Sequence, residues 1–153
     1  MKLLVSSCLL GEKVRYDAKG NKIDSKLFES IINSHQIFSF CPEVQGGLPT
    51  PRPAAEIHNK KVISSKNIDF TNEFEEGALK ALTLCKEENI VLALLKAKSP
   101  SCGNKQIYDG TFSGKLINGM GICAKKLQAH NIVVYNENEL ESLVKAINDL
   151  ELK

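Results

Sequence analysis

The sequence predicts an α/β fold in which a mostly parallel sheet of about four strands is flanked by helices. Two observations lead to this prediction. Short apolar runs of strand length alternate with segments whose apolar residues recur at helical spacing, and a helix or a long loop separates each strand from the next. Parallel strands need such crossover connections. Because 153 residues is the length of one ordinary domain, we expect residues 1–153 to form a single domain.

The predicted strands are four apolar runs that each end near polar or turn-forming residues. They are Leu3–Val5, Ile37–Phe40, Ile90–Leu95 and Ile132–Tyr135. A weaker pattern at Glu56–Ser64 has two short extended candidates on either side of Asn59, which predicts a small hairpin. The four main runs would form the sheet, and the hairpin would be an addition to it.

Two long segments have the apolar spacing of amphipathic helices. Their apolar residues are Phe74, Ala78, Ala81, Leu82 and Cys85 in the first segment, and Leu140, Leu143, Val144, Ile147 and Leu150 in the second. Asn72 and Asn138 each stand three positions before a glutamate, which predicts a capping box at each helix start. We expect Asp24 to cap a further helix through Ile32. Helices between strands complete a Rossmann-like architecture, which places a site at the carboxyl ends of the strands.

Composition restricts the class of protein. The formal net charge is only +2 and there are only two arginines, so the chain has no strong electrostatic footprint for a long nucleic acid, and a small molecule or mononucleotide fits better. No apolar stretch approaches the roughly 20 residues of a membrane helix. The five cysteines are an odd number without a CxxC pair, and the short apolar start has no small-residue cleavage site. We therefore expect a reduced, cytoplasmic protein.

Three cysteines follow three of the predicted strands. Cys8 lies just beyond the first strand, Cys41 just beyond the second, and Cys102 in the loop after the third. Because the carboxyl ends of parallel strands share one edge, we expect these thiols to converge. Thiolates are soft ligands that suit zinc or an iron–sulfur cluster, and three of them would leave one position open for chemistry. His58 or Glu43 could instead complete a closed site, so the spacing alone does not select the metal.

The other two cysteines lie within helical patterns. Cys85 continues an apolar helix face, and Cys123 precedes Leu127 by one helical turn. We expect both to be packing residues, because a free cysteine in a helix commonly behaves as a small hydrophobic residue.

The loop after Cys41 carries a carboxylate. Glu43 stands two residues after the cysteine, in a loop that continues with glycines and prolines to Arg52. Proline fixes φ and glycine permits close approach, so this loop could bring Glu43 over an open metal position. There the carboxylate could act as a general acid or base.

The segment before Cys102 carries hydroxyl groups and a cation. Ser99 and Ser101 could donate hydrogen bonds to cluster sulfur, water or a substrate carbonyl, and Lys98 could bind an anionic part of the substrate. Arg15 and Arg52 fall in the other two loops expected at this edge, and a guanidinium suits phosphate or carboxylate.

Two further segments are candidates for loops and anion binding. Tyr108–Gly114 is expected to form a polar loop, and Gly119–Gly121 to open a helix whose free N–H groups could receive an anion. Neither a phosphate-binding GxxxxGK[ST] motif nor GxGxxG is present at a strand-to-helix junction.

Five sequence blocks, read together, resemble the DUF523 family, which includes the thiouracil desulfidases. The blocks are Val5–Gly11, Val14–Asp17, Cys41–Arg52, Ser99–Gly103 and Ile107–Gly114, so the resemblance runs nearly end to end. It implies a [4Fe-4S] cluster held by Cys8, Cys41 and Cys102, with one iron not ligated by protein. It also implies a catalytic pair of Glu43 and a serine, for which Ser99 is our first choice before Ser101.

The implied reaction is the exchange of the thiocarbonyl sulfur of a thiolated pyrimidine for oxygen from water, without net redox change. We expect 4-thiouracil compounds as substrates, 4-thiouridine monophosphate first, with free 2- or 4-thiouracil next. The alternatives are a zinc hydrolase that uses the same cysteines and a non-catalytic iron–sulfur carrier or sensor. The chain departs from the family pattern at Met120 and Cys123, where the resemblance leads us to expect aspartate and threonine.

Overall fold

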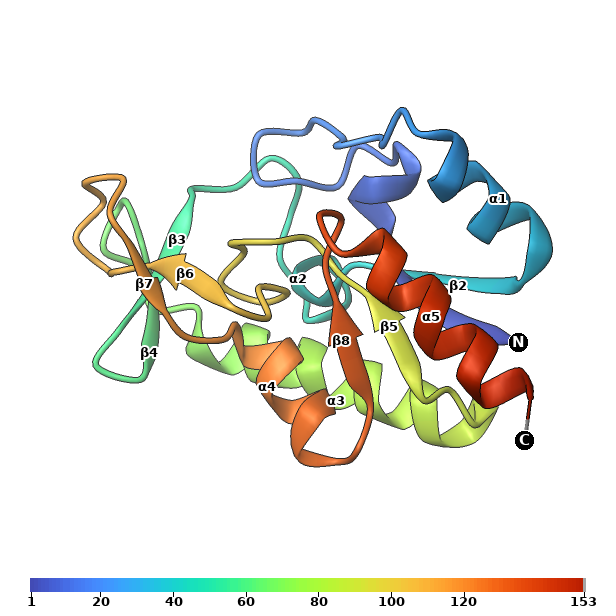
Figure 1. The fold of residues 1–153 in the computed structure, drawn as a ribbon. Helices are drawn as coiled ribbons and strands as arrows, with labels where there is room; N and C mark the ends of the chain where they lie inside the picture. Colours follow the sequence, from blue (N-terminus) through green and yellow to red (C-terminus); the bar gives the residue numbers. More distant parts are fainter. Residues whose placement is uncertain (153) are drawn as a thin grey trace.

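The computed structural model describes residues 1–152 and contains the expected four-stranded sheet (Figure 1). The α/β prediction is confirmed. The elements are β1 (Lys2–Ser6), the 3-10 helix η1 (Ser7–Leu10), α1 (Lys26–Ser34), β2 (Gln36–Phe40), α2 (Pro42–Gln45), β3 (Ala55–His58), β4 (Lys61–Ser64), α3 (Thr71–Glu88), β5 (Leu92–Leu94), β6 (Gln106–Tyr108), β7 (Leu116–Asn118), α4 (Ile122–Ala129), β8 (Val133–Tyr135) and α5 (Leu140–Glu151).

The main sheet has the strand order β2-β1-β5-β8, and each neighbouring pair is parallel. From β1 the chain crosses to β2 on one side and later places β5 on the other side. The order of the strands therefore reverses between β1 and β5, and open α/β sheets bind ligands at such a point, outside the carboxyl ends of the strands. In Figure 1 these ends face the two hairpins, on the side away from the two chain termini.

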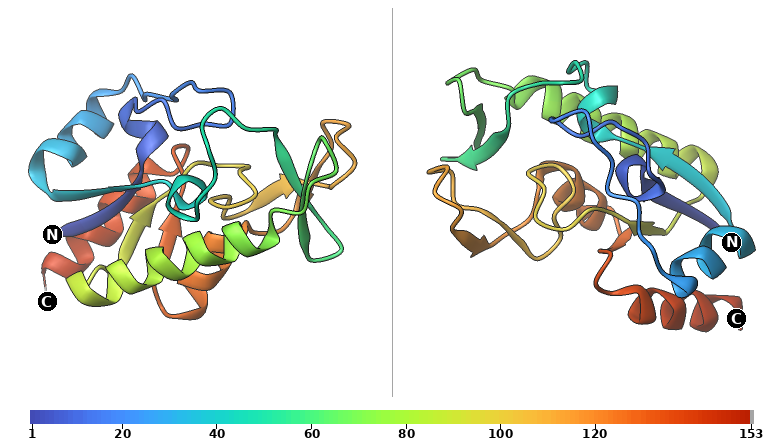
Figure 2. Two further views of the ribbon diagram at one scale, coloured as in Figure 1. Left: turned by 180° about the vertical axis from the view of Figure 1, so that it is seen from behind. Right: turned by 90° about the horizontal axis from the view of Figure 1, so that it is seen from above.

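Helices cover both faces of the sheet. The pair α3 and α4 packs on one face and the pair α1 and α5 on the other (Figure 2). Strand β1 serves both layers, because Leu4 packs with α3 and α4 whereas Leu3 and Val5 pack toward α1 and α5. A sheet buried on both faces explains why its strands are continuous apolar runs in the sequence. Among the residues that the structure describes, no helix combines the length and the apolar character that crossing a membrane requires.

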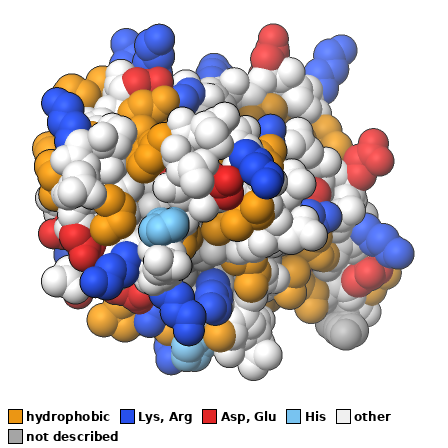
Figure 3. Space-filling model, turned by 90° about the vertical axis from the view of Figure 1, so that its left-hand side faces the viewer, with side chains coloured by type: hydrophobic (Ala, Val, Ile, Leu, Met, Phe, Trp, Pro, Cys, Tyr) orange, Lys and Arg blue, Asp and Glu red, His pale blue; other side chains and the backbone are white. Residues whose placement is uncertain are grey.

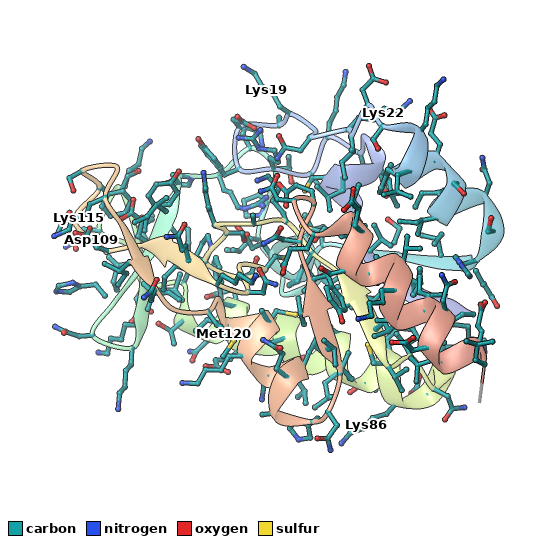
Figure 4. All side chains as sticks on the ribbon, in the orientation of Figure 1. Lys19, Lys22, Lys86, Asp109, Lys115 and Met120 are labelled. Atoms are coloured by element: carbon teal, nitrogen blue, oxygen red, sulfur yellow. The ribbon has the colours of Figure 1, made fainter. Side chains whose placement is uncertain are left out.

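Two small antiparallel hairpins lie beside the sheet. The predicted hairpin at Glu56–Ser64 is confirmed as β3 and β4, and a small cluster that includes Val62 and Phe74 packs it against α3. The second hairpin, β6 and β7, was not predicted: part of it falls in the segment Tyr108–Gly114, which we expected to be only a polar loop. Figure 4 marks Asp109 and Lys115 at the outer end of this hairpin.

The predicted helix caps are wrong. Helix α1 is capped by Ser25, whose side chain accepts a hydrogen bond from the backbone N–H of Phe28, and not by Asp24. Helix α3 already begins at Thr71, so Asn72 lies inside it. Before α5, the Asn138 N–H donates to the side chain of Asn136, and the helix begins only at Leu140. Among the three, only α1 has a side-chain cap, and the N-cap residues of α3 and α5, Phe70 and Glu139, make no such bond.

Candidate active site

The carboxyl ends of β1, β2 and β5 border a cavity of about 470 Å³. All the site residues predicted from the sequence line it: Cys8, Arg15, Cys41, Glu43, Arg52, Lys98, Ser99, Ser101 and Cys102. The predicted convergence of the three strand-end cysteines is therefore present in the structure. Within residues 1–152, Cys85 and Cys123 are not among the residues that line the cavity; they pack in the core between the sheet, α3 and α4.

Each of the three cysteines is positioned by the element that follows its strand. Cys8 lies in η1 directly after β1, Cys41 is the N-cap residue of α2 directly after β2, and Cys102 lies in the turn after β5. Burial raises the pKa of the Cys8 thiol to about 11 and that of Cys102 to about 12, and the charge that Cys41 would carry raises both pKa values further. The three thiols thus lie within electrostatic range of one another, and a bound cation would have to displace their protons.

Polar groups surround the sulfur atoms. The hydroxyls of Ser6 and Ser101 each donate to Cys102 Sγ at 3.5 Å, and both bonds lower the pKa of this thiol against the effect of burial. Lys96 also lines the cavity; its charge lowers the pKa of Cys8, although burial dominates. The ammonium of Lys96 is paired with Glu137 at 2.7 Å. Hydroxyl donors and a cation near thiolates are the surroundings that suit cluster sulfur ligands.

The donor set fits an iron–sulfur cluster. All five cysteines are free, and the three at the cavity supply only soft thiol ligands. In the part of the chain that the structure describes, no group of three or more His, Cys, Asp or Glu side chains forms a site for a single metal ion. Three thiols with hydroxyl donors beside them are the kind of donor set that an iron–sulfur cluster takes.

Close backbone contact between α2 and α3 fixes Cys41 and Glu43. A Cβ atom on Gly77 of α3 would overlap the carbonyl oxygen of Pro42, and one on Gly46 would overlap the carbonyl oxygen of Glu73. Only glycine permits this approach. Because Pro42 is also buried, the short helix that carries Glu43 is held against the body of the protein.

Glu43 lies between a guanidinium and a hydroxyl. Arg52 Nε donates to Glu43 Oε1 at 3.1 Å, and Ser101 Oγ donates to Glu43 Oε2 at 2.9 Å. The side chain of Glu43 is 16% exposed, so it reaches the cavity while both of its oxygens are held. This arrangement orients a carboxylate beside the three thiols.

Arg52 is buried and bonded to the protein, whereas a residue that binds substrate would need a free guanidinium. Its side chain is only 2% exposed. Besides Glu43, it donates to the carbonyl oxygens of Pro49 and Val14 and to the hydroxyl of Thr50. The guanidinium therefore ties the loop between α2 and β3 to the loop after η1, and it positions Glu43.

The two candidate serines have distinct roles. Ser99 Oγ accepts hydrogen bonds from the backbone N–H groups of Ser101 and Cys102, at 3.1 and 3.0 Å, and so holds the turn. Ser101 Oγ lies 2.9 Å from Ser99 Oγ and donates to Glu43. Ser101 has one hydroxyl proton and two acceptors within reach, Glu43 Oε2 and Cys102 Sγ, and either serine can be the donor in the pair of Ser99 and Ser101. Ser101, not our first choice Ser99, is in direct contact with the carboxylate.

Helix α4 supports this turn and does not bind an anion as we expected. Its first N–H groups donate to the carbonyl oxygens of Pro100 and Ser101, at distances of 2.9 to 3.1 Å. The predicted anion site is therefore wrong: the loop with the serines already satisfies these donors.

Met120 and Cys123 are the two positions at which the sequence departs from the family pattern. Met120, which Figure 4 shows beside α4, accepts a hydrogen bond from the side chain of Gln128, and Cys123 is fully buried.

Arg15 and Lys98 are the more accessible cations of the cavity. Arg15 donates to Asn21, pairs with Asp17 at 3.3 Å and lies 5.8 Å from the ring centre of Tyr16. Lys98 is exposed, and within residues 1–152 its ammonium forms no ion pair. Both remain candidates for binding an anionic part of a substrate.

The sequence prediction missed several cavity residues that come from the hairpins and the strand ends. They are Ser6, Glu56, Lys96, Tyr108 and Phe112. Ser6 and Lys96 stand at the ends of predicted strands, so the rule that selected the cysteines could have found them. Glu56, Tyr108 and Phe112 reach the cavity only because the hairpins fold over it, and nothing in the local sequence indicates this.

The sequence and the structure are similar to those of known proteins. A family model described as 2-thiouracil desulfurase matches residues 3–139. A protein of Bacillus subtilis (strain 168) described as uncharacterized protein YbbK is 38% identical over 152 residues, which cover 93% of this chain and 99% of that protein. A solved structure described as the [4Fe-4S]-dependent thiouracil desulfidase TudS (DUF523Vcz) is 44% identical, has a TM-score of 0.93 and covers 96% of this chain and 97% of its own.

Proposed function

Because the chain belongs to the 2-thiouracil desulfurase family, DUF523, we propose that it is an enzyme that removes sulfur from thiouracil with the help of a [4Fe-4S] cluster. In the overall reaction, water adds oxygen to the thiocarbonyl carbon, the carbon–sulfur bond breaks, and the sulfur leaves as sulfide with the protons of the water. No electrons are gained or lost. The observation that carries the proposal is one cavity lined by three strand-end thiols and by the hydrogen-bonded pair of Glu43 and Ser101.

Cys8, Cys41 and Cys102 would hold the cluster. We expect these three thiolates to leave one of the four irons without a protein ligand. When bound, such a cluster supplies a thiophilic, Lewis-acidic iron that favours departure of the sulfur. The hydroxyls of Ser6 and Ser101, which contact Cys102 Sγ, would stabilise the thiolate form of this ligand.

Glu43 would move the protons. A carboxylate held by Arg52 can accept a proton from the attacking water and return it to the departing sulfur, as a general base and then a general acid. The hydroxyl of Ser101 would help to orient this carboxylate, and the hydroxyl of Ser99 can supply a hydrogen bond to Ser101 in turn. We therefore assign the catalytic pair to Glu43 and Ser101, with Ser99 as the residue that holds their turn.

We propose 4-thiouracil compounds as the substrates, with 4-thiouridine monophosphate preferred and free 2- or 4-thiouracil next. Two cations of the cavity, Arg15 and the exposed Lys98, support a phosphate on the substrate. The five free cysteines support a reducing, cytoplasmic location.

The test is anaerobic purification and cluster reconstitution, followed by incubation with 2-thiouracil, 4-thiouracil and 4-thiouridine monophosphate. Loss of thiocarbonyl absorbance, formation of the oxo product and release of sulfide are expected. Analysis of iron, zinc and acid-labile sulfide in the same preparation separates the alternatives. Zinc without labile sulfide would favour a hydrolase, and an intact cluster without turnover would favour a carrier or sensor.

A further inference from the structure

Two aromatic side chains of the β6–β7 hairpin line the cavity without belonging to the core. Tyr108 ends β6 and Phe112 stands in the turn, and neither is part of a hydrophobic cluster among residues 1–152. Phe112 is 42% exposed, and its φ of 56° lies in the left-handed region that bulky residues rarely adopt. An exposed aromatic side chain at the cavity, held in this conformation, is a candidate for contact with a ligand.

The turn that carries Phe112 is held in place by Glu56 of β3. One carboxylate oxygen, Glu56 Oε1, accepts hydrogen bonds from the backbone N–H groups of Gly110 and Phe112, at 3.0 and 3.1 Å. Gly110 has φ +94°, and a Cβ atom there would lie 2.6 Å from the carbonyl oxygen of Ile57. The turn is therefore packed onto β3, and these contacts hold it in one conformation.

The same hairpin is joined to the loop that carries Ser99 and Ser101. Ile107 of β6 forms a β-bridge with Lys98, directly before Ser99. At the far end of the hairpin, the Gly119 N–H donates to the carbonyl oxygen of Lys105. Tyr108 and Phe112 thus belong to a framework that has a fixed position relative to the turn from Ser99 to Cys102.

A third aromatic residue of the cavity is already engaged. The guanidinium of Arg15 lies 5.8 Å from the ring centre of Tyr16, within the range of a cation–π contact. On the hairpin side of the molecule, Figure 3 shows hydrophobic side chains between charged ones. The fourth, Phe40, packs in the core, so Tyr108 and Phe112 are the aromatic residues of the cavity with neither a cation–π partner nor a core cluster in the described part of the chain.

We propose that Tyr108 and Phe112 form the face on which the pyrimidine ring of the substrate stacks, and that Glu56 is the positioning residue of this face. The identity of the ligand rests on the proposed function. Stacking uses the flat π surface of a ring and not its edge, so it accepts thiocarbonyl groups at different ring positions. It also discriminates against aliphatic thioamides, which have no such ring.

Equilibrium dialysis of cluster-loaded protein with uracil, the product, tests the face without turnover. Phe112→Ala and Tyr108→Ala should each raise the Kd for uracil roughly 5- to 150-fold. Phe112→Tyr and Tyr108→Phe keep an aromatic ring and should bind uracil like the wild type. Circular dichroism of the alanine variants shows whether they are folded. Ile117→Ala is the matched control, because Ile117 is an exposed hydrophobic residue of the same hairpin that does not line the cavity.

The role of Glu56 has its own signature. Glu56→Ala should raise the Kd for uracil and the KM for 4-thiouracil while kcat stays near the wild-type value. Glu56→Gln should restore both, because the amide oxygen can still accept from the two backbone N–H groups. A fall in kcat alone, or no rescue by glutamine, would overturn the positioning role.

The outcomes separate this proposal from the proposed function. Turnover of 4-thiouracil with unchanged uracil binding in Phe112→Ala and Tyr108→Ala would overturn the stacking face and leave the function intact. Aromatic-dependent uracil binding without turnover would overturn the function and support the face. Absence of uracil binding by the wild type would overturn the face in either case.

Discussion

The five cysteines fall into two groups with different surroundings, although Cys102 of the first group is buried nearly as fully as Cys85 of the second. Cys102 is 5% exposed and Cys85 is 1% exposed, and burial raises the pKa of both thiols, to about 12 and about 11. The difference is in the neighbours: Cys102 contacts two hydroxyls at a cavity, whereas Cys85 packs among apolar side chains of α3 and α4. Burial and thiol pKa therefore do not separate the two groups, whereas position at a strand end beside the cavity does.

The largest expected effect is loss of the cluster when one of the three strand-end cysteines is replaced. Cys8→Ser, Cys41→Ser and Cys102→Ser should each lose the cluster and nearly all activity, because serine is a hard, weak ligand for iron–sulfur clusters. Iron and acid-labile sulfide per chain, measured after anaerobic reconstitution, give the result.

Cys85→Ala and Cys123→Ala are the matched controls for the three ligand variants. They should keep the cluster and activity and cost about 1 kcal/mol of the free energy of unfolding, because each leaves a small cavity in the core. Loss of the cluster in these two variants alone would reverse the assignment of the two groups.

Glu43→Gln should keep the cluster but lower kcat about 100-fold or more, because the amide cannot take a proton from water. Steady-state kinetics with 4-thiouracil measure this. Glu88→Gln is the control, since Glu88 makes only a partly exposed ion pair with Lys2. Equal activity of both variants would remove Glu43 from the mechanism.

Replacing Ser101 should mainly affect kcat, whereas replacing Ser99 should also affect stability. Ser101→Ala should lower kcat about 10- to 100-fold, because it removes the hydroxyl that contacts Glu43. Ser99→Ala should lower kcat less and reduce the free energy of unfolding by about 1 kcal/mol, because two backbone N–H groups lose their acceptor. Kinetics and denaturant unfolding of both variants decide, and a larger kcat effect at Ser99 would favour our original choice.

Arg52→Lys tests how the carboxylate is positioned. Lysine keeps the charge but not the planar fork, so the bonds to Glu43 and to the loop cannot all form. We expect a loss of about 2 kcal/mol in the free energy of unfolding and a smaller decrease in kcat than in Glu43→Gln. Denaturant unfolding measures the first effect; an unchanged midpoint would show that the guanidinium does not hold this loop.

The smallest expected effect concerns the phosphate. Lys98→Ala should raise the KM for 4-thiouridine monophosphate about 3- to 10-fold and leave that for free 4-thiouracil unchanged, because an exposed cation contributes only modestly. Parallel kinetics with both substrates measure it. Equal changes for the two substrates would contradict a phosphate contact at Lys98.

The main fold was predictable because it depends on periodic burial. Strands that are covered on both faces remain continuous apolar runs, and helices that cover a sheet keep an apolar stripe, so both are visible in the sequence. The convergence of Cys8, Cys41 and Cys102 follows from the topology alone. The family resemblance, which the family model confirms, added the expected cluster and the reaction.

The remaining features depend on contacts between distant segments. Strands β6 and β7 have three residues each and are largely polar or exposed, so they show no strand pattern. Their pairing places Tyr108 and Phe112 at the cavity. The contact of Ser101 with Glu43 likewise depends on the turn geometry, and the first N–H groups of α4 donate to carbonyl oxygens of the same turn. No local pattern contains these contacts.

The most direct test of the central claim is turnover of 4-thiouracil in ¹⁸O-labelled water by anaerobically reconstituted protein without added reductant. Our account predicts equal amounts of sulfide and uracil, with the heavy oxygen in the uracil, and no such activity in Cys102→Ser. An intact cluster that releases no sulfide, or sulfide release that requires a reductant, would contradict it.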